Sequence, residues 1–192
     1  MNYQDYIWDL GGTLLDNYET STAAFVHTLQ DFGLTGSHDE VYKALKVSTD
    51  YAVRQFAPGN KEFLKSYKAN EAKELEHPIL FEGASELLAQ IIQQGGRNFL
   101  ISHRDDQVLE ILQKTQISAY FTEVVTATNG FKRKPDPESM LYLKDKYQIE
   151  SGLVIGDRPI DIEAGQAAGF SCYLFDNMRN LEEFVDIELE KE

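Results

Sequence analysis

The side chains best suited to chemistry in this chain are aspartates that directly follow short apolar runs. Asp9 comes after the apolar run 6–8 and is followed closely by Gly11 and Gly12. A run of β-branched and aromatic residues that stops at a glycine pair is typical of a strand, and its last side chain lies at the carboxyl edge of a sheet, where open α/β folds bind ligands. Asp9 is therefore a candidate reactive or metal-binding group.

A pair of aspartates follows the apolar run 153–155. Asp157 comes one residue after Gly156, and Asp161 lies four residues further on. If 153–155 is a strand, the two carboxylates lie at its end and at the start of the next helix, where they can converge on one cation. Magnesium prefers carboxylate and water oxygens and usually leaves positions for a substrate phosphate. Asp161 has an alternative role, since an acidic residue also stabilises a helix N-terminus.

A serine and a lysine are candidates for binding an anion. Ser102 closes the predicted strand 98–101, in which three apolar residues follow Asn98, and its hydroxyl could donate to a phosphate oxygen. Lys134 precedes Asp136 and Pro137, which are typical of an N-cap and the first position of a helix, so the chain at Lys134 should be held in place. A fixed ammonium can neutralise a phosphoryl group and a nucleophile. The alternative is a solvated basic loop.

The elements that must position these residues differ in two parts of the chain. Between about Asp16 and Pro78 apolar residues recur at helical spacing, which predicts three or four short helices. From Phe81 onward, apolar residues at helical spacing alternate with short, mostly apolar runs at 98–101, 124–125, 153–155 and 172–175. This alternation predicts a βαβ series with a parallel sheet. The strand before Asp9 should lie centrally in that sheet, with the helical segment inserted after it.

The composition excludes several classes of protein. A chain of 192 residues with 42% hydrophobic residues can bury one full core and a small second domain. The single cysteine, Cys172, excludes an intramolecular disulfide and a multi-cysteine metal site. A net charge of -14 argues against nucleic acid or an anionic membrane as a partner. The first twenty residues lack a basic start followed by an apolar stretch, so a cytoplasmic location is expected.

The candidate residues also follow the order of a known family. Asp9, Ser102, Lys134, Asp157 and Asp161 resemble the four motifs of the haloacid dehalogenase-like (HAD) hydrolases, most closely its phosphatase-type members with a small helical cap, such as the phosphoglycolate phosphatase and phosphoglucomutase branch. The resemblance implies an α/β fold, with a Rossmann-like parallel sheet of about five strands in the order 3-2-1-4-5 and an inserted helical cap. Residues 1–15 and 79–192 would form the core, and residues 16–78 the cap.

The resemblance also implies the chemistry of the metal site. Asp9 would attack phosphorus and form an aspartyl phosphate. Mg²⁺ would be held by Asp9, the carbonyl of Gly11 and Asp157. Asp161 would orient the cation or Lys134. The expected enzyme is therefore a magnesium-dependent hydrolase.

The remaining implied residues bind the substrate. Ser102 and Lys134 would hold the phosphoryl group that is transferred, and both would act in catalysis. His103 and Arg104, next to Ser102, are further candidates for substrate binding. The expected partner is a small phosphorylated metabolite, and the oligomeric state is not predicted.

Position 11 departs from the first motif of the family. That motif is usually D-x-D-G-T, and its second aspartate is the general acid/base, but this chain has Gly11 there. A positioned acid contributes about 10²- to 10⁴-fold when the leaving group is poor. Three outcomes are open: the substrate has a leaving group that needs no proton, such as an acyl phosphate; Asp16, His103 or Arg104 replaces the acid; or the protein binds a phosphometabolite with little or no turnover.

Some members of the family have no aspartate at this position. Haloalkanoate dehalogenases have a different residue there, and phosphonoacetaldehyde hydrolases have a small residue and use a cap lysine to form a Schiff base. Lys43 and Lys46 lie in the segment expected to form the cap. A hydrolase of phosphonates or haloacids is therefore the alternative to a phosphatase.

Overall fold

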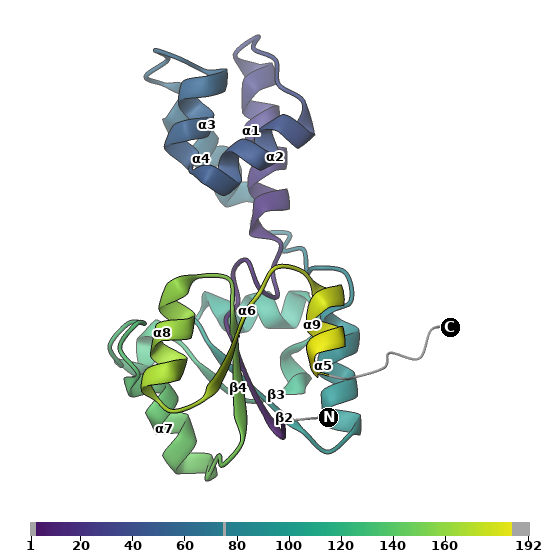
Figure 1. The fold of residues 1–192 in the computed structure, drawn as a ribbon. Helices are drawn as coiled ribbons and strands as arrows, with labels where there is room; N and C mark the ends of the chain where they lie inside the picture. The colour runs from purple at the N-terminus through teal and green to yellow at the C-terminus, as the bar shows by residue number, and fades with distance from the viewer. Residues whose placement is uncertain (1–2, 75, 186–192) are drawn as a thin grey trace. The chain divides into compact units, whose positions relative to one another are not determined.

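The structure is a computed structural model that describes residues 3–74 and 76–185. The chain divides into two compact units. The core unit contains the chain up to Leu15 and from Leu80 onward, and the helical unit spans Asp16–Ile79. Figure 1 shows the strands of the core unit and the helices of both units.

The core unit is built on a parallel sheet. Its described residues form five strands in the order β3-β2-β1-β4-β5, which confirms the predicted order 3-2-1-4-5. The strand that precedes Asp9 is central and pairs with β2 and β4. The strands are β1 (Asp5–Trp8), β2 (Arg97–Ile101), β3 (Phe121–Val125), β4 (Gly152–Gly156) and β5 (Ser171–Leu174).

Helices cover both faces of this sheet. On one face lie α5 (Ala84–Gln93), α6 (Gln107–Lys114) and α9 (Met178–Val185), and on the other α7 (Glu138–Tyr147) and α8 (Pro159–Ala167), as Figure 1 shows. Two short 3-10 turns, η1 (Ser118–Tyr120) and η2 (Ala127–Asn129), flank β3. The three central strands, β1, β2 and β4, are covered on both faces and are mostly apolar, which is why short apolar runs in the sequence predict them.

The packing of β1 shows how the sheet is stabilised. Tyr6 and Trp8 pack into the cluster on one face and Ile7 into the cluster on the other. Each such buried side chain contributes about 1.5–3 kcal/mol relative to an exposed one. The indole of Trp8 donates to Asn98 Oδ1 at 2.9 Å, and the amide of Asn98 donates to the carbonyl of Leu88 at 3.1 Å. The fully buried polar side chain of Asn98 in β2 is therefore satisfied.

The helical unit has four helices in its described residues, where the periodicity predicts three or four. They are α1 (Asn17–Asp31), α2 (His38–Val47), α3 (Thr49–Phe56) and α4 (Phe63–Glu74). α1 packs against α2 and α4, and the rings of Phe63 and Tyr67 meet Phe25 edge-on, with centroids 4.9 and 5.0 Å away. Across the described parts of both units, no helix has the length and apolar character needed to cross a membrane.

Candidate active site

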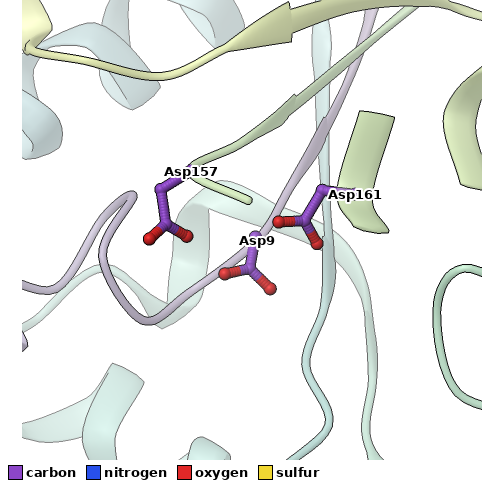
Figure 2. A group of neighbouring side chains, drawn as sticks. All are labelled: Asp9, Asp157 and Asp161. Atoms are coloured by element: carbon purple, nitrogen blue, oxygen red, sulfur yellow. The ribbon is translucent and has the colours of Figure 1, made fainter. Parts of the chain in front are cut away.

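The carboxylates of Asp9 and Asp157 follow neighbouring strands at the same edge of the sheet. β1 and β4 are parallel, and the amide of Asp9 donates to the carbonyl of Ile155 at 2.9 Å. Asp157 comes directly after β4, and Asp161 lies in the first turn of α8. Figure 2 shows the three carboxylates gathered together. Each offers one oxygen, and these oxygens lie within 4.8 Å of one another, a spacing that suits one divalent cation.

The ammonium group of Lys134 lies between two of these carboxylates. Its Nζ donates to Asp9 Oδ1 at 2.5 Å and to the carbonyl of Ile101 at 3.4 Å, and it pairs with Asp161 Oδ1. The side chains of Lys134, Asp9 and Asp161 are only 1%, 6% and 1% exposed. Ions buried this deeply require partners, because desolvating each one costs several kcal/mol. Lys134 is a single buried positive charge beside a cluster of three carboxylates.

Burial raises the pKa of both Asp9 and Asp157. For Asp9 the loss of solvent is the largest cause, the ammonium of Lys134 acts in the opposite direction, and Asp161 adds to the increase in pKa. Burial, followed by the charges of Asp9 and Asp161, raises the pKa of Asp157 to about 6. Asp157 Oδ1 is buried and has no hydrogen-bond partner among the described residues. A divalent cation fits these residues, because it would supply the positive charge and the ligand contacts that the oxygens lack.

Two glycines allow the carboxylates to approach one another. Gly12 has φ +83°, and a Cβ there would overlap the carboxylate of Asp157. A Cβ on Gly156 would overlap Asp161 in the same way. Glycine is therefore required in the turn after β1 both for its backbone conformation and for space. Gly11 lies in this turn, and its carbonyl stays a predicted metal ligand.

The two carboxylate oxygens of Asp161 have different partners, a hydrogen bond at Oδ2 and an ion pair at Oδ1. Oδ2 accepts a hydrogen bond from the amide of Arg158 at 3.2 Å, at the N-terminus of α8, and Oδ1 pairs with Lys134. Each of the two roles predicted for Asp161 therefore has a matching contact. The bond to Arg158 suits a helix N-terminus, and the ion pair suits a residue that orients Lys134. Its role in orienting Lys134 or a cation stays a prediction.

The start of α7 differs by one residue from the prediction. The sequence predicts Asp136 as N-cap and Pro137 as the first helical residue, but the structure has Pro137 as N-cap and the helix begins at Glu138. Asp136 Oδ1 instead accepts from the amide of Glu138, two residues on, at 3.0 Å. This is an Asx turn, a contact that competes with helical capping. The turn begins at Asp136, two residues after Lys134, where the sequence predicts a helix start.

Ser102, His103 and Arg104 follow the end of β2. Ser102 is buried, its amide donates to the carbonyl of Val125 at 2.9 Å, and its Oγ accepts from the amide of Arg104 at 3.2 Å. His103 Nε2 accepts a hydrogen bond from the amide of Lys134 at 3.1 Å. Burial is the largest cause that lowers the pKa of His103 to about 4, and the charge of Lys134 comes next. The ring is therefore neutral at neutral pH, and its Nε2 is already used as an acceptor.

The other candidates for an acid or a Schiff-base lysine lie in the helical unit. Asp16 is the N-cap of α1 and accepts from the amide of Glu19 at 3.0 Å. The Nζ of Lys46 lies over the ring of Tyr42, 5.1 Å from its centroid. Lys43 is exposed on α2. The contacts of Asp16 and Lys46 are those of a helix cap and a cation–π pair, which are ordinary structural roles.

Arg158 is a charged neighbour of the site to which sequence reasoning assigns no role. The positive charge of Arg158 opposes the increase in the pKa of Asp9 and Asp157, and it adds to the decrease in the pKa of His103. The signal was present in the sequence, as a basic residue directly after Asp157. Without the fold, however, nothing relates Arg158 to Asp9 or His103, which are far away along the chain.

Comparisons with known proteins show which family the chain resembles over most of its length. A family model described as haloacid dehalogenase-like hydrolase matches residues 6–175. A solved structure of a hydrolase from Streptococcus pneumoniae TIGR4 is 70% identical, covers 97% of this chain and 100% of its own, and superposes with a TM-score of 0.94. A phosphoglycolate phosphatase from Aliivibrio fischeri is 28% identical and the pyrophosphatase PpaX from Oceanobacillus iheyensis 26% identical, each match covering 88% of this chain and 81% of the relative.

Proposed function

Because the chain belongs to the haloacid dehalogenase-like hydrolase family, we propose that it is a magnesium-dependent phosphatase acting on a small phosphorylated metabolite. The observation that carries the proposal is the buried ion cluster at the carboxyl edge of the sheet. Its carboxylates can hold one divalent cation, and Lys134 supplies a fixed positive charge beside Asp9. The names of two relatives, a phosphoglycolate phosphatase and a pyrophosphatase, support a phosphorylated substrate.

The proposed nucleophile is Asp9. Lys134 bonds to Oδ1 of this carboxylate, which leaves Oδ2 to attack phosphorus. The new bond joins Asp9 to phosphorus as the bond to the leaving oxygen breaks, and water then hydrolyses the aspartyl phosphate and restores the carboxylate. Splitting one difficult displacement into two easier steps is the advantage of covalent catalysis.

The surrounding residues would stabilise charge during both steps. Asp9, Asp157 and the carbonyl of Gly11 would hold Mg²⁺, which when bound supplies positive charge between the nucleophile and a phosphate dianion. Ser102 and Lys134 would donate hydrogen bonds to the phosphoryl oxygens, with His103 and Arg104 beside them. Preorganised donors of this kind lower the barrier because they need no rearrangement as charge develops.

The glycine at position 11 limits the leaving groups that we expect the enzyme to tolerate. A glycine cannot protonate a leaving alkoxide, and His103, one of the candidates to replace the acid, has its Nε2 already occupied. Acyl phosphates need no such proton, because a carboxylate leaves readily. We therefore expect good leaving groups to react fastest. We also assign to the helical unit the role of a cap that selects the substrate.

The test is phosphate release from acetyl phosphate and para-nitrophenyl phosphate, with and without Mg²⁺. We expect magnesium-dependent turnover that Asp9→Asn abolishes while the exposed control Asp145→Asn leaves it unchanged. Full activity in Asp9→Asn would rule the mechanism out. If the protein binds inorganic phosphate but hydrolyses neither substrate, the result would indicate the alternative, a phosphometabolite-binding protein.

A second comparison tests the role of position 11. Gly12 has positive φ, whereas Gly11 is not among the glycines that do, so an aspartate can be introduced at position 11 without that strain. Gly11→Asp should raise the rate of hydrolysis of alkyl phosphates, whose leaving groups are poor, by about 10²- to 10⁴-fold. Turnover that stays absent in this variant would direct attention to phosphonates and haloacids as substrates.

A further inference from the structure

The end of β2 contacts Lys134 at two points. Its last residue, Ile101, accepts a hydrogen bond from the ammonium group through its backbone carbonyl at 3.4 Å. Two residues later, His103 Nε2 accepts from the backbone amide of Lys134 at 3.1 Å. One contact therefore holds the tip of the lysine side chain and the other holds its backbone.

The second contact determines the protonation state of His103. A backbone amide is always a donor, so Nε2 must be unprotonated and the ring proton of a neutral imidazole must lie on Nδ1. The pKa of His103, lowered to about 4, agrees with this assignment. Its causes are burial first and then the positive charges of Lys134, Arg133 and Arg158, opposed by Asp161.

The backbone at Lys134 needs such an anchor. Lys134 is buried, but its chain neighbours Arg133 and Pro135 are exposed. Other backbone contacts of this loop are local: the amide of Lys132 donates to Glu138 at 2.8 Å, and Asp136 donates to the carbonyl of Arg133 at 3.0 Å. These bonds shape the loop, whereas the bond to His103 ties it to the sheet that carries Asp9.

We propose that His103 is a positioning residue, which fixes the backbone of Lys134 so that the ammonium group stays between Asp9 and Asp161. A lysine has a long flexible stem and reaches a defined point only if its backbone is fixed. His103 thereby acts through Lys134 and does not transfer a proton. The kinetic part of the test rests on the proposed phosphatase function, and the spectroscopic part does not.

The spectroscopic test uses the unaltered protein at neutral pH. In a ¹⁵N-labelled sample, the N–H···N hydrogen bond should give a scalar coupling between the amide nitrogen of Lys134 and Nε2 of His103, with the ring proton on Nδ1. In His103→Ala the Nζ signal of Lys134 should shift or exchange faster with water. Absence of the coupling together with an unchanged Nζ signal would overturn the proposal, whether or not the protein is an active phosphatase.

The kinetic test separates positioning from proton transfer. His103→Ala should lower kcat by about tenfold, the effect of losing one hydrogen bond in a polar site, and by the same factor for acetyl phosphate and para-nitrophenyl phosphate. His103→Gln, whose amide oxygen can accept in place of Nε2 but cannot act as an acid, should restore most of kcat. The control Gln113→Ala, at an exposed residue of α6 in the core unit, should behave as wild type.

Two kinetic outcomes would overturn the proposal. A loss that grows as the leaving group becomes poorer, and that His103→Gln does not restore, would show that His103 is a general acid. A His103→Ala enzyme with wild-type kcat would show that the anchor is unnecessary. If the wild-type protein turns over neither substrate, the proposed function fails, and the coupling and the Nζ signal still decide the positioning role.

Discussion

Replacing Lys134 by methionine would leave two buried carboxylates without their common partner. The ammonium bonds to Asp9 and pairs with Asp161, and both carboxylates are almost fully buried. Methionine has a similar length, so the packing around the stem should change little. The change therefore removes mainly the positive charge.

The magnitude follows from the burial of these groups. Removing one partner of a buried ion pair costs about 3–5 kcal/mol, because it leaves an uncompensated charge. The pKa of Asp9 is already raised by burial, and without the lowering effect of Lys134 it should rise further. A group whose pKa is raised in the folded state favours folding at low pH, and this contribution is lost as the pH rises through the folded pKa. The destabilisation should therefore be largest near pH 8 and smaller near pH 5.

The assay is urea denaturation of wild type and Lys134→Met in EDTA, at about pH 5 and about pH 8. The matched control is Lys132→Met in the same loop, where the lysine side chain is 73% exposed and the change in unfolding free energy should stay within about 0.5 kcal/mol. Equal stability of Lys134→Met and wild type at both pH values would refute the reasoning. If the loss of unfolding free energy in Lys134→Met is the same at both pH values, the expected increase in the pKa of Asp9 is refuted.

Three further predictions concern Asp157 and the turn beside it. Asp157→Asn should raise the Mg²⁺ concentration needed for half-maximal activity at least tenfold. The pKa of Asp157 is raised to about 6, so its negative charge opposes folding above that pH. Near pH 8 in EDTA, Asp157→Asn should therefore unfold at a higher temperature than wild type, as measured by calorimetry. Gly12→Ala should cost about 2 kcal/mol more than Gly95→Ala in urea denaturation, since both glycines have φ +83° but only at Gly12 does a Cβ meet Asp157. Equal costs at the two glycines would contradict the role of that close approach.

The strands of the sheet could be predicted from the sequence because of how they are buried. A central parallel strand is covered on both faces, so runs such as 153–155 are apolar at every position and stand out from the amphipathic helices. Asp9 and Asp157 could each be predicted to lie at the carboxyl edge of the sheet for the same reason, since both closely follow such runs. The carboxyl ends of parallel strands meet at one edge, and the position of a side chain just after the strand is then determined.

Helix boundaries were less predictable. Asp136 and Pro137 have the residue types of a cap and a first helical position, but the structure shifts the helix by one residue because Asp136 bonds within a turn. Asp and Asn side chains can satisfy either arrangement with similar energy, so the neighbouring packing decides between them.

By itself, the sequence determined the parallel α/β core, the order in which the candidate residues follow its strands and the absence of a carboxyl group at position 11. Each of these depends on residue type, periodicity or the end of a strand, which are local properties. Only the tertiary structure decided which charges share the buried cluster. Lys134 meets Asp9 across 125 residues of chain and His103 across 31, and burial then raises the pKa of Asp157 and lowers that of His103. Contacts between distant segments and the loss of solvent around them arise only when the chain is folded, so no local pattern encodes them.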